Sequence, residues 1–287
     1  MFPFRHFRFG NRELDLSIPH VMGILNITPD SFSDGGELLQ HGKPALEQVL
    51  QRADAMVKAG ATLLDIGGES TRPGAAPVTE AEELARVAPV VEALSHRFDV
   101  VLSVDTSSAS VIKASVELGA GLINDVRALT RPGALAAAAA SGLPVCLMHM
   151  QGDPRTMQAA PTYDDVVGEI IAFLRERIAA CTAAGIGRER ILLDPGFGFG
   201  KTVTHNLELL RALGRFSALE CPVLVGLSRK RMLGTFTGKP EKQRVAAGIA
   251  AAVVAVMNGA RIVRTHDVPE TVDALQVCRH LQQLHDR

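Results

Sequence analysis

Eight short apolar runs recur along the chain, and segments long enough for a helix separate them. The runs are almost continuously apolar rather than alternating, which is typical of parallel strands that are buried on both faces. They lie at residues 20–28, 62–68, 100–106, 122–126, 144–150, 191–198, 222–228 and 261–268. Eight strands that alternate with about eight helices predict an α/β protein, a single (β/α)8 barrel rather than an open sheet.

The segments between the runs carry helix signals at their ends. Helices are expected at residues 45–59, 80–97, 164–184 and 241–257. Thr79 precedes the second of these, and Glu82 completes the pattern of a capping box. Gly60 and Gly185 stand where glycine commonly follows a helix. We assign residues 20–287 to the barrel domain and residues 1–19 to an N-terminal extension or a first short hairpin.

Composition narrows the class of protein. The 287 residues include 30 Lys and Arg against 31 Asp and Glu, a net charge of -1, and 47% are hydrophobic. Such a chain supports a packed core, and its near-neutral charge argues against nucleic-acid or membrane-surface partners. The longest apolar run, at residues 245–257, is too short to span a bilayer.

The cysteines and the first residues of the chain bear on location. The four cysteines are far apart and form no CxxC pair, so we expect reduced, packed thiols; they are Cys146, Cys181, Cys221 and Cys278. The start of the sequence is basic and aromatic but lacks the apolar stretch of a signal peptide. Together these features predict a cytoplasmic protein.

Polar side chains gather where the apolar runs end, and in barrel enzymes these strand ends carry the chemistry. Among them are Asn26, Asp65, Asp105, Asn124, Asp125, His149, Asp194, Ser228, Arg264, His266 and Asp267. Two loops, at residues 29–36 and 69–78, are rich in Gly, Ser and Pro and have the composition of lids. We therefore expect the active site at the C-terminal ends of the strands.

Residue type suggests what such a site would bind. The segments after the last two strands form the usual phosphate corner of a barrel, and they carry Arg229, Lys230, Arg231, Arg264 and His266. These side chains suit an anion such as a diphosphate. The acceptors and donors of Asp105, Asn124 and Asp194 suit an amino-substituted heterocycle.

Structural explanations compete with these functional ones. For Asp65 and Asp267 a structural hydrogen bond or salt bridge is the better explanation, and for His149, Arg229 and Arg231 the question stays open. For Asp105, Asp194 and Lys230 a ligand is the simplest partner, because an unpaired buried charge is costly.

Three other enzyme classes fit poorly. The string FGFGKT at residues 197–202 resembles the end of a nucleotide-binding P-loop, but that motif needs glycine where this chain has Pro195. The spacing of Gly196, Gly198 and Gly200 also fails the dinucleotide fingerprint. A metal hydrolase is not expected, because no His and Asp cluster occurs at short spacing.

Eight strings at successive strand ends resemble those of the dihydropteroate synthase family. They are GILNITPDSFSDGG from Gly23, DIGGESTRPGA from Asp65, SVDT from Ser103, INDV from Ile123, LMHMQGDPRTMQ from Leu147, DPGFGFGK from Asp194, GLSRKRMLG from Gly226 and RTHDV from Arg264. They follow the family's order from residue 23 to residue 268. Departures are small: Ser108 stands where the family often has lysine, and Arg231 stands where a small residue is common.

The resemblance implies a magnesium-dependent transferase of folate biosynthesis. Such an enzyme joins 7,8-dihydropterin-6-ylmethyl diphosphate to 4-aminobenzoate and releases diphosphate, with the C–O bond ionising before the amine attacks. The family is generally a sulfonamide target and usually a homodimer, so we expect both properties here.

The resemblance also assigns roles to residues. The pterin site would comprise Asp105, Asn124, Asp194 and Lys230, and the diphosphate site Asn26, Arg264 and His266, with Asn26 also near Mg²⁺. The aminobenzoate site would comprise Thr71, Arg72, Pro73, Phe199, Ser228 and Lys230, and Met148 and Gly226 would complete the substrate-binding set. Catalytic roles would fall to Asp34, which helps cover the reacting centre, and to Asp105, Lys230, Arg264 and His266.

Two rival functions remain. A pterin-binding barrel that transfers a methyl group from methyltetrahydrofolate to a corrinoid partner would share the pterin-binding acids. It would not need the STRPG, SRK or RxHD strings, and all three are present. A catalytically silent relative that binds pterin or scaffolds another folate enzyme would be expected to lose charged site residues, and here none is missing.

Overall fold

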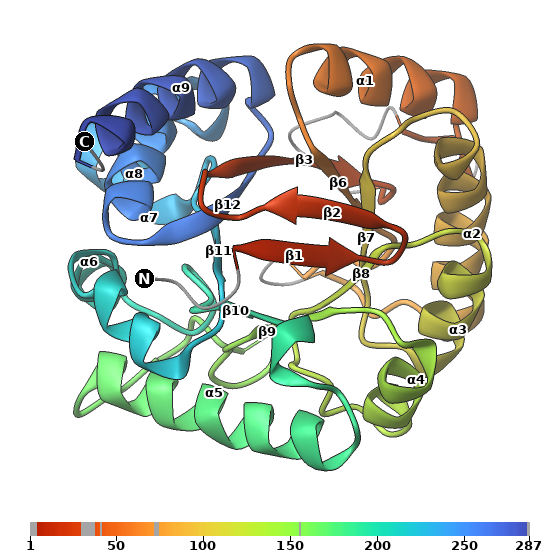
Figure 1. The fold of residues 1–287 in the computed structure, drawn as a ribbon, viewed down its shortest axis with the longest axis horizontal. Helices are drawn as coiled ribbons and strands as arrows, with labels where there is room; N and C mark the ends of the chain where they lie inside the picture. Colours follow the sequence, from red (N-terminus) through yellow and green to blue (C-terminus); the bar gives the residue numbers. More distant parts are fainter. Residues whose placement is uncertain (1–4, 30–37, 41, 72–74, 155, 286–287) are drawn as a thin grey trace.

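The computed structural model describes residues 5–29, 38–40, 42–71, 75–154 and 156–285. In these residues eight parallel strands close into a barrel in the order β10-β11-β12-β3-β6-β7-β8-β9. The helices form a ring around the barrel (Figure 1). The single (β/α)8 barrel expected from the sequence is therefore confirmed.

The barrel strands coincide with the eight apolar runs. They are β3 (His20–Asn26), β6 (Leu63–Gly67), β7 (Val101–Asp105), β8 (Leu122–Asp125), β9 (Val145–Met148), β10 (Ile191–Asp194), β11 (Val223–Gly226) and β12 (Ala260–Thr265). All eight end one to four residues before the runs do, because there the chain already turns into the loops that carry the polar side chains. A separate two-stranded pair joins β4 (Leu39–Gln40) and β5 (Lys43–Pro44).

Nine α-helices occur in the described residues. They are α1 (Leu46–Lys58), α2 (Glu80–Ser95), α3 (Ala109–Glu117), α4 (Ala134–Ser141), α5 (Val166–Ala183), α6 (Val203–Arg211), α7 (Arg231–Thr237), α8 (Val245–Met257) and α9 (Val268–His285). The capping box of α2 is confirmed, since the Thr79 side chain accepts from the Glu82 amide and the Glu82 side chain accepts from the Thr79 amide. No helix in the described part of the chain is both long and apolar enough to cross a membrane.

One expected helix begins later than the sequence indicated. Residues 241–257 do not form a continuous helix, because Glu241–Gln243 is a separate 3-10 turn and α8 starts at Val245. Arg244 lies between them, where its guanidinium donates to the carbonyl oxygens of Lys239 (2.9 Å) and Arg229 (3.0 Å). These tertiary bonds hold the break, and helix periodicity does not reveal them.

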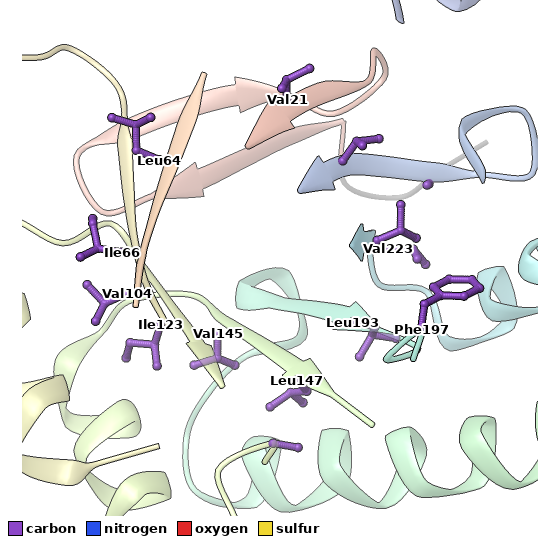
Figure 2. Packing of buried hydrophobic residues seen from close by; sticks show 14 of the residues in the cluster. Val21, Leu64, Ile66, Val104, Ile123, Val145, Leu147, Leu193, Phe197 and Val223 are labelled. Atoms are coloured by element: carbon purple, nitrogen blue, oxygen red, sulfur yellow. The ribbon is translucent and has the colours of Figure 1, made fainter. Parts of the chain in front are cut away.

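The hydrophobic core between strands and helices is built from alternate strand positions. Leu64 and Ile66 of β6 and Val104 of β7 point outward toward the helices (Figure 2). Side chains along a strand alternate between its two faces, so Leu63 and Asp65 face the barrel interior.

The interior begins with an apolar floor to which each of the eight strands contributes one buried side chain. These are Met22, Leu63, Val101, Leu122, Cys146, Leu192, Leu224 and Ile262. Phe7, Phe9 and Leu16 pack beneath it, the two phenylalanines from the antiparallel hairpin of β1 (His6–Phe9) and β2 (Arg12–Asp15). This hairpin crosses the near end of the barrel (Figure 1). Burying an aliphatic or aromatic side chain contributes about 1.5–3 kcal/mol, so the floor contributes to the stability of the barrel. The boundary at residue 20 between extension and barrel domain stays a prediction.

Candidate active site

The next inward position on each strand lies two residues further along, directly above the floor, and five of these eight positions carry polar side chains. This second level comprises Ile24, Asp65, Ser103, Asn124, Met148, Asp194, Gly226 and Arg264. Above it opens a cavity of about 790 Å³ at the C-terminal ends of the strands. The expected position of the site is thus where the structure has its large cavity.

The cavity brings together every predicted site residue that the structure describes. These are Asn26, Thr71, Asp105, Asn124, Met148, Asp194, Phe199, Gly226, Ser228, Lys230, Arg264 and His266. Asp34, Arg72 and Pro73 lie outside the described residues. The roles assigned to these side chains stay predictions, although their convergence from distant parts of the sequence on one cavity supports them.

A charged network ties the second level together. Asp65 is fully buried, and its carboxylate accepts from Arg264 Nε (2.5 Å) and from Ser103 Oγ (2.5 Å). The Asn124 amide nitrogen lies 3.3 Å from the same carboxylate. Arg264 Nη2 also contacts Asp105 Oδ2 at 3.3 Å. The structural explanation favoured for Asp65 is therefore confirmed.

Asp105 already has a partner within the protein, because Arg264 pairs with it; that a ligand also binds Asp105 stays a prediction. The two residues lie 159 positions apart in the sequence. The closure of the barrel pairs β12 with β3, β3 with β6 and β6 with β7, and so brings them to the same side of the cavity. Arg264 therefore pairs with the carboxylates of Asp65 and Asp105 and also faces the cavity.

Burial sets the protonation of the two acids that line the cavity. Burial raises the pKa of Asp105 well above its usual range, and the neighbouring Asp65 carboxylate raises it further, while Arg264 opposes both. Burial also raises the pKa of Asp194, against the Gly196 amide that donates to it at 2.7 Å and the positive charge of Lys230. A ligand that donates N–H groups to these carboxyls would favour their charged forms.

Lys230 is held beside an aromatic wall of the cavity. Its Nζ lies 4.2 Å from the centroid of the Phe199 ring, within the range of a cation–π contact. Phe199 belongs to the loop that follows β10, and Lys230 follows β11. The two neighbouring strand ends thus place a cation and a flat apolar surface together.

Lys201 is a buried residue of this site that sequence reasoning missed. Its ammonium donates to the carbonyl oxygens of Gly196 (2.8 Å) and Phe199 (2.9 Å) and to His149 Nδ1 (3.0 Å). Burial lowers the pKa of Lys201 to about 7 and that of His149 to about 3, so His149 is a neutral acceptor. Gly196 has φ +72°, and a β-carbon there would overlap the His149 carbonyl oxygen. Lys201 ends the DPGFGFGK string that resembles the family, but neither that string nor its likeness to a P-loop indicated a role for the lysine.

In the predicted phosphate corner, after β11 and β12, two of the protein's own side chains form an ion pair. Arg229 Nη2 donates to Asp267 Oδ1 at 2.5 Å, which confirms the structural explanation favoured for Asp267. Ser228 Oγ accepts from the His266 amide at 3.2 Å and lies 3.2 Å from His266 Nδ1. These bonds orient the loops after β11 and β12 against each other, with Ser228 and His266 facing the cavity.

The chain itself provides few metal ligands here. The described residues contain no group of three or more His, Cys, Asp and Glu side chains that could hold a metal ion. A β-carbon at Gly67 would lie 3.7 Å from Asn26 Oδ1 and 3.9 Å from Asp105 Oδ2, so both oxygens border one space. Mg²⁺ takes oxygen ligands and is commonly held by one or two protein groups together with substrate phosphates. The residues fit a magnesium ion that arrives with a diphosphate.

Comparison with known proteins places this barrel in the class of pterin-binding enzymes. The family model described as pterin binding enzyme matches residues 22–266. The chain is 56% identical to dihydropteroate synthase of Escherichia coli (strain K12), over 92% of either chain. It is 52% identical to dihydropteroate synthase of Haemophilus influenzae, over 93% of this chain and 96% of that one.

Solved structures agree with this assignment. The Yersinia pestis dihydropteroate synthase in a sulfonamide drug complex superposes with a TM-score of 0.94 at 56% identity, over 97% of this chain and 99% of that one. The Xanthomonas albilineans dihydropteroate synthase with 4-aminobenzoic acid superposes with a TM-score of 0.89 at 50% identity, over 97% and 98%. The chain belongs to the dihydropteroate synthase family, whose members are transferases of folate biosynthesis.

The charged network makes one prediction about protonation. Asp65→Asn should lower the pKa of Asp105 by about 1–2 pH units, because the substitution removes a nearby negative charge and leaves Arg264 to pair with Asp105. Carboxyl carbon NMR of labelled protein measures this value, and Ser103→Ala is the control that keeps the Asp65 charge. An Asp105 pKa that stays unchanged or rises in Asp65→Asn would contradict this account of the network.

Proposed function

We propose that this chain condenses 7,8-dihydropterin-6-ylmethyl diphosphate with 4-aminobenzoate to give 7,8-dihydropteroate and diphosphate. The observation that carries the proposal is the convergence of Asp105, Asn124 and Asp194 with Lys230 and Arg264 on one cavity. Family membership supports it, as do the sulfonamide drug in the Yersinia pestis structure and the 4-aminobenzoic acid in the Xanthomonas albilineans structure.

The pterin is assigned to the deep end of the cavity. Asp105, Asn124 and Asp194 offer acceptors and donors at the edges of a flat amino-substituted heterocycle. Burial raises the pKa of both acids and so disfavours their charged forms. The N–H groups of the ring would donate to the two carboxylates and stabilise these charged forms. A heterocycle that lacks a matching N–H would leave a buried acid unsatisfied, which supports rejection of wrong rings.

The diphosphate is assigned to Asn26, Arg264 and His266. The Arg264 guanidinium has five N–H donors, and its contacts with Asp65 and Asp105 use two of them. Asn26 is the residue of this set that would also hold Mg²⁺, which when bound would neutralise charge on the departing diphosphate. These groups stabilise negative charge at the place where it develops as the leaving group departs.

The aminobenzoate is assigned to the part of the cavity that Thr71, Phe199, Ser228 and Lys230 line. Arg72 and Pro73 would complete this part and Asp34 would help cover the reacting centre, as the family resemblance implies. A sulfonamide with a 4-aminophenyl group would compete for the same place.

The bond changes follow from this arrangement. The C–O bond between the pterin methylene and the diphosphate breaks, and its electron pair leaves with the diphosphate. The pterin ring stabilises the positive methylene carbon, which the aromatic amine attacks; the amine nitrogen then loses one proton. An aromatic amine is neutral at pH 7 and needs no strong base, so the residues' task is to hold the two substrates in line and keep water out.

We also propose a cytoplasmic homodimer. Four large apolar side chains are exposed on three helices that contact one another, namely Leu207 of α6, Phe236 of α7, and Val254 and Met257 of α8. An exposed apolar patch of this kind is typical of an interface between subunits. The absence of paired cysteines in the sequence supports a reducing compartment.

The dimer proposal predicts the effect of a charge on α8. Val254→Glu should convert a dimer to monomers, because an isologous interface would bury two new carboxylates. Sedimentation equilibrium measures the mass. Val277→Glu on α9 is the matched control, since Val277 is more exposed than Val254 and lies outside the patch. A wild-type monomer, or a Val254→Glu protein that remains dimeric, would rule out this interface.

The function itself is tested by product formation. Purified protein is given the pterin diphosphate and Mg²⁺, with and without 4-aminobenzoate, and diphosphate and dihydropteroate are both measured. Equimolar release that needs both substrates for turnover is expected, and EDTA should suppress it. Pterin binding without product would favour a silent relative, and methyl transfer from methyltetrahydrofolate to a corrinoid would favour the other rival.

The role of Asp105 predicts a separation of binding from stability. Asp105→Asn should weaken pterin diphosphate binding by about 10- to 100-fold, the value of a lost charge-assisted hydrogen bond. Folding should not suffer: burial raises the Asp105 pKa, so deprotonation at rising pH costs the wild-type protein stability that the neutral amide keeps. Calorimetry gives the affinity and urea unfolding at pH 5 and 8 gives the stability. Near-normal affinity would remove Asp105 from the pterin site.

A further inference from the structure

The base of the loop at residues 69–78 is held by a largely buried ion pair between Glu69, at the edge of the cavity, and Arg127. Glu69, the second residue after β6, is only 10% exposed in its side chain. The Arg127 guanidinium makes a bidentate contact with the Glu69 carboxylate: Nη1 donates to Oε2 at 2.9 Å, and Nη2 donates to Oε1 at 3.1 Å. Arg131 adds a longer contact of 3.5 Å from a more exposed side chain. A two-pronged pair of this kind fixes the orientation as well as the position of the carboxylate.

Ser107 and Asp125 in turn hold Arg127. Its Nη1 also donates to Ser107 Oγ at 3.1 Å, and Ser107 donates to the buried carboxylate of Asp125. Asp125 is fully buried and accepts from the amides of Arg127 and Leu129, each at 2.8 Å. Residues at the ends of β7 and β8 therefore hold Arg127 in the position from which its guanidinium contacts Glu69.

The backbone that presents Arg127 is strained. Ala128 and Leu129 are consecutive non-glycine residues with φ of +50° and +59°, both buried. Such residues rarely adopt left-handed φ, and the strain persists only where the surroundings impose it. Here Asp125 holds the turn from one side, and Arg177 donates to the Ala128 carbonyl at 2.9 Å from the other. Strain that is maintained at this place points to a functional requirement.

We propose that Arg127 is a positioning residue for this loop: by holding Glu69 it sets where Thr71 stands at the edge of the cavity. Arg127 is not among the residues that line the cavity, whereas Glu69 and Thr71 are. Two residues of chain reach at most about 7 Å, so the position of Thr71 depends closely on that of Glu69. The inference rests on the proposed function, in which Thr71 borders the aminobenzoate.

The test compares the two substrates in Arg127→Ala. The KM for 4-aminobenzoate should rise by about tenfold or more, because a shift near 1 Å in a substrate-positioning group can cost a hundredfold in rate. The affinity for pterin diphosphate should stay within about twofold, since Asp105, Asn124 and Asp194 keep their own partners. Arg127→Lys, which keeps the charge but loses the fork, should give an intermediate KM.

Arg131→Ala is the matched control. It removes a cation from the same carboxylate but only through a long, more exposed contact, so the KM for 4-aminobenzoate should change by less than about threefold. A second readout needs no activity: amide hydrogen exchange in a peptide that spans residues 66–71 should speed up in Arg127→Ala and not in Arg131→Ala.

Each outcome decides between the proposals. A folded Arg127→Ala with both substrate constants and the exchange rate unchanged overturns the inference, and so does an equal loss of affinity for both substrates. If Arg127→Ala does not fold, Glu69→Gln takes its place, and a selective rise in the KM for 4-aminobenzoate is again the expected result. If the wild-type protein makes no dihydropteroate, the proposed function fails, while the exchange measurement still decides whether Arg127 anchors the loop.

Discussion

The two-residue period of the barrel strands is the constraint on which the rest of the structure depends. One inward position on each strand builds the apolar floor, and the next inward position, two residues on, carries the groups of the second level. Leu63 and Asp65, or Ile262 and Arg264, illustrate the change from apolar to charged within one step of the strand. The charged level is therefore seated on a packed base, which keeps water from reaching it from below.

The balance of positive and negative charge in this second level determines what the site can bind. One guanidinium, that of Arg264, serves two carboxylates, those of Asp65 and Asp105. Asp65 holds the shorter contact and receives two further donors, from Ser103 and Asn124, so it is the better satisfied partner. Asp105 is left with a long contact and a raised pKa, which makes it the acid that gains from a ligand with N–H groups.

The sequence was sufficient for the parts of this arrangement that follow from local pattern. Continuous apolar runs located all eight barrel strands, and the motifs at their ends located the cavity. The pairing of Arg264 with Asp105 was out of reach, because it depends on which strands close the barrel. Lys201 was missed because its acceptors are mostly backbone carbonyls. Every residue has such a carbonyl, so the sequence does not show which ones accept from the lysine. The left-handed turn at Ala128 and Leu129 left no trace either, since neither is a glycine or an asparagine.

The same strand ends provide both the substrate cavity and the anchor of its loop. Asp105 and Asn124 face the cavity, and the residues just beyond them, Ser107 and Asp125, hold Arg127. A displacement of either strand end would therefore move the heterocycle's contacts and the base of the 69–78 loop together. Placing both functions on β7 and β8 lets one rigid element keep two substrate sites in register, which a condensation requires, because the reacting atoms come from different molecules.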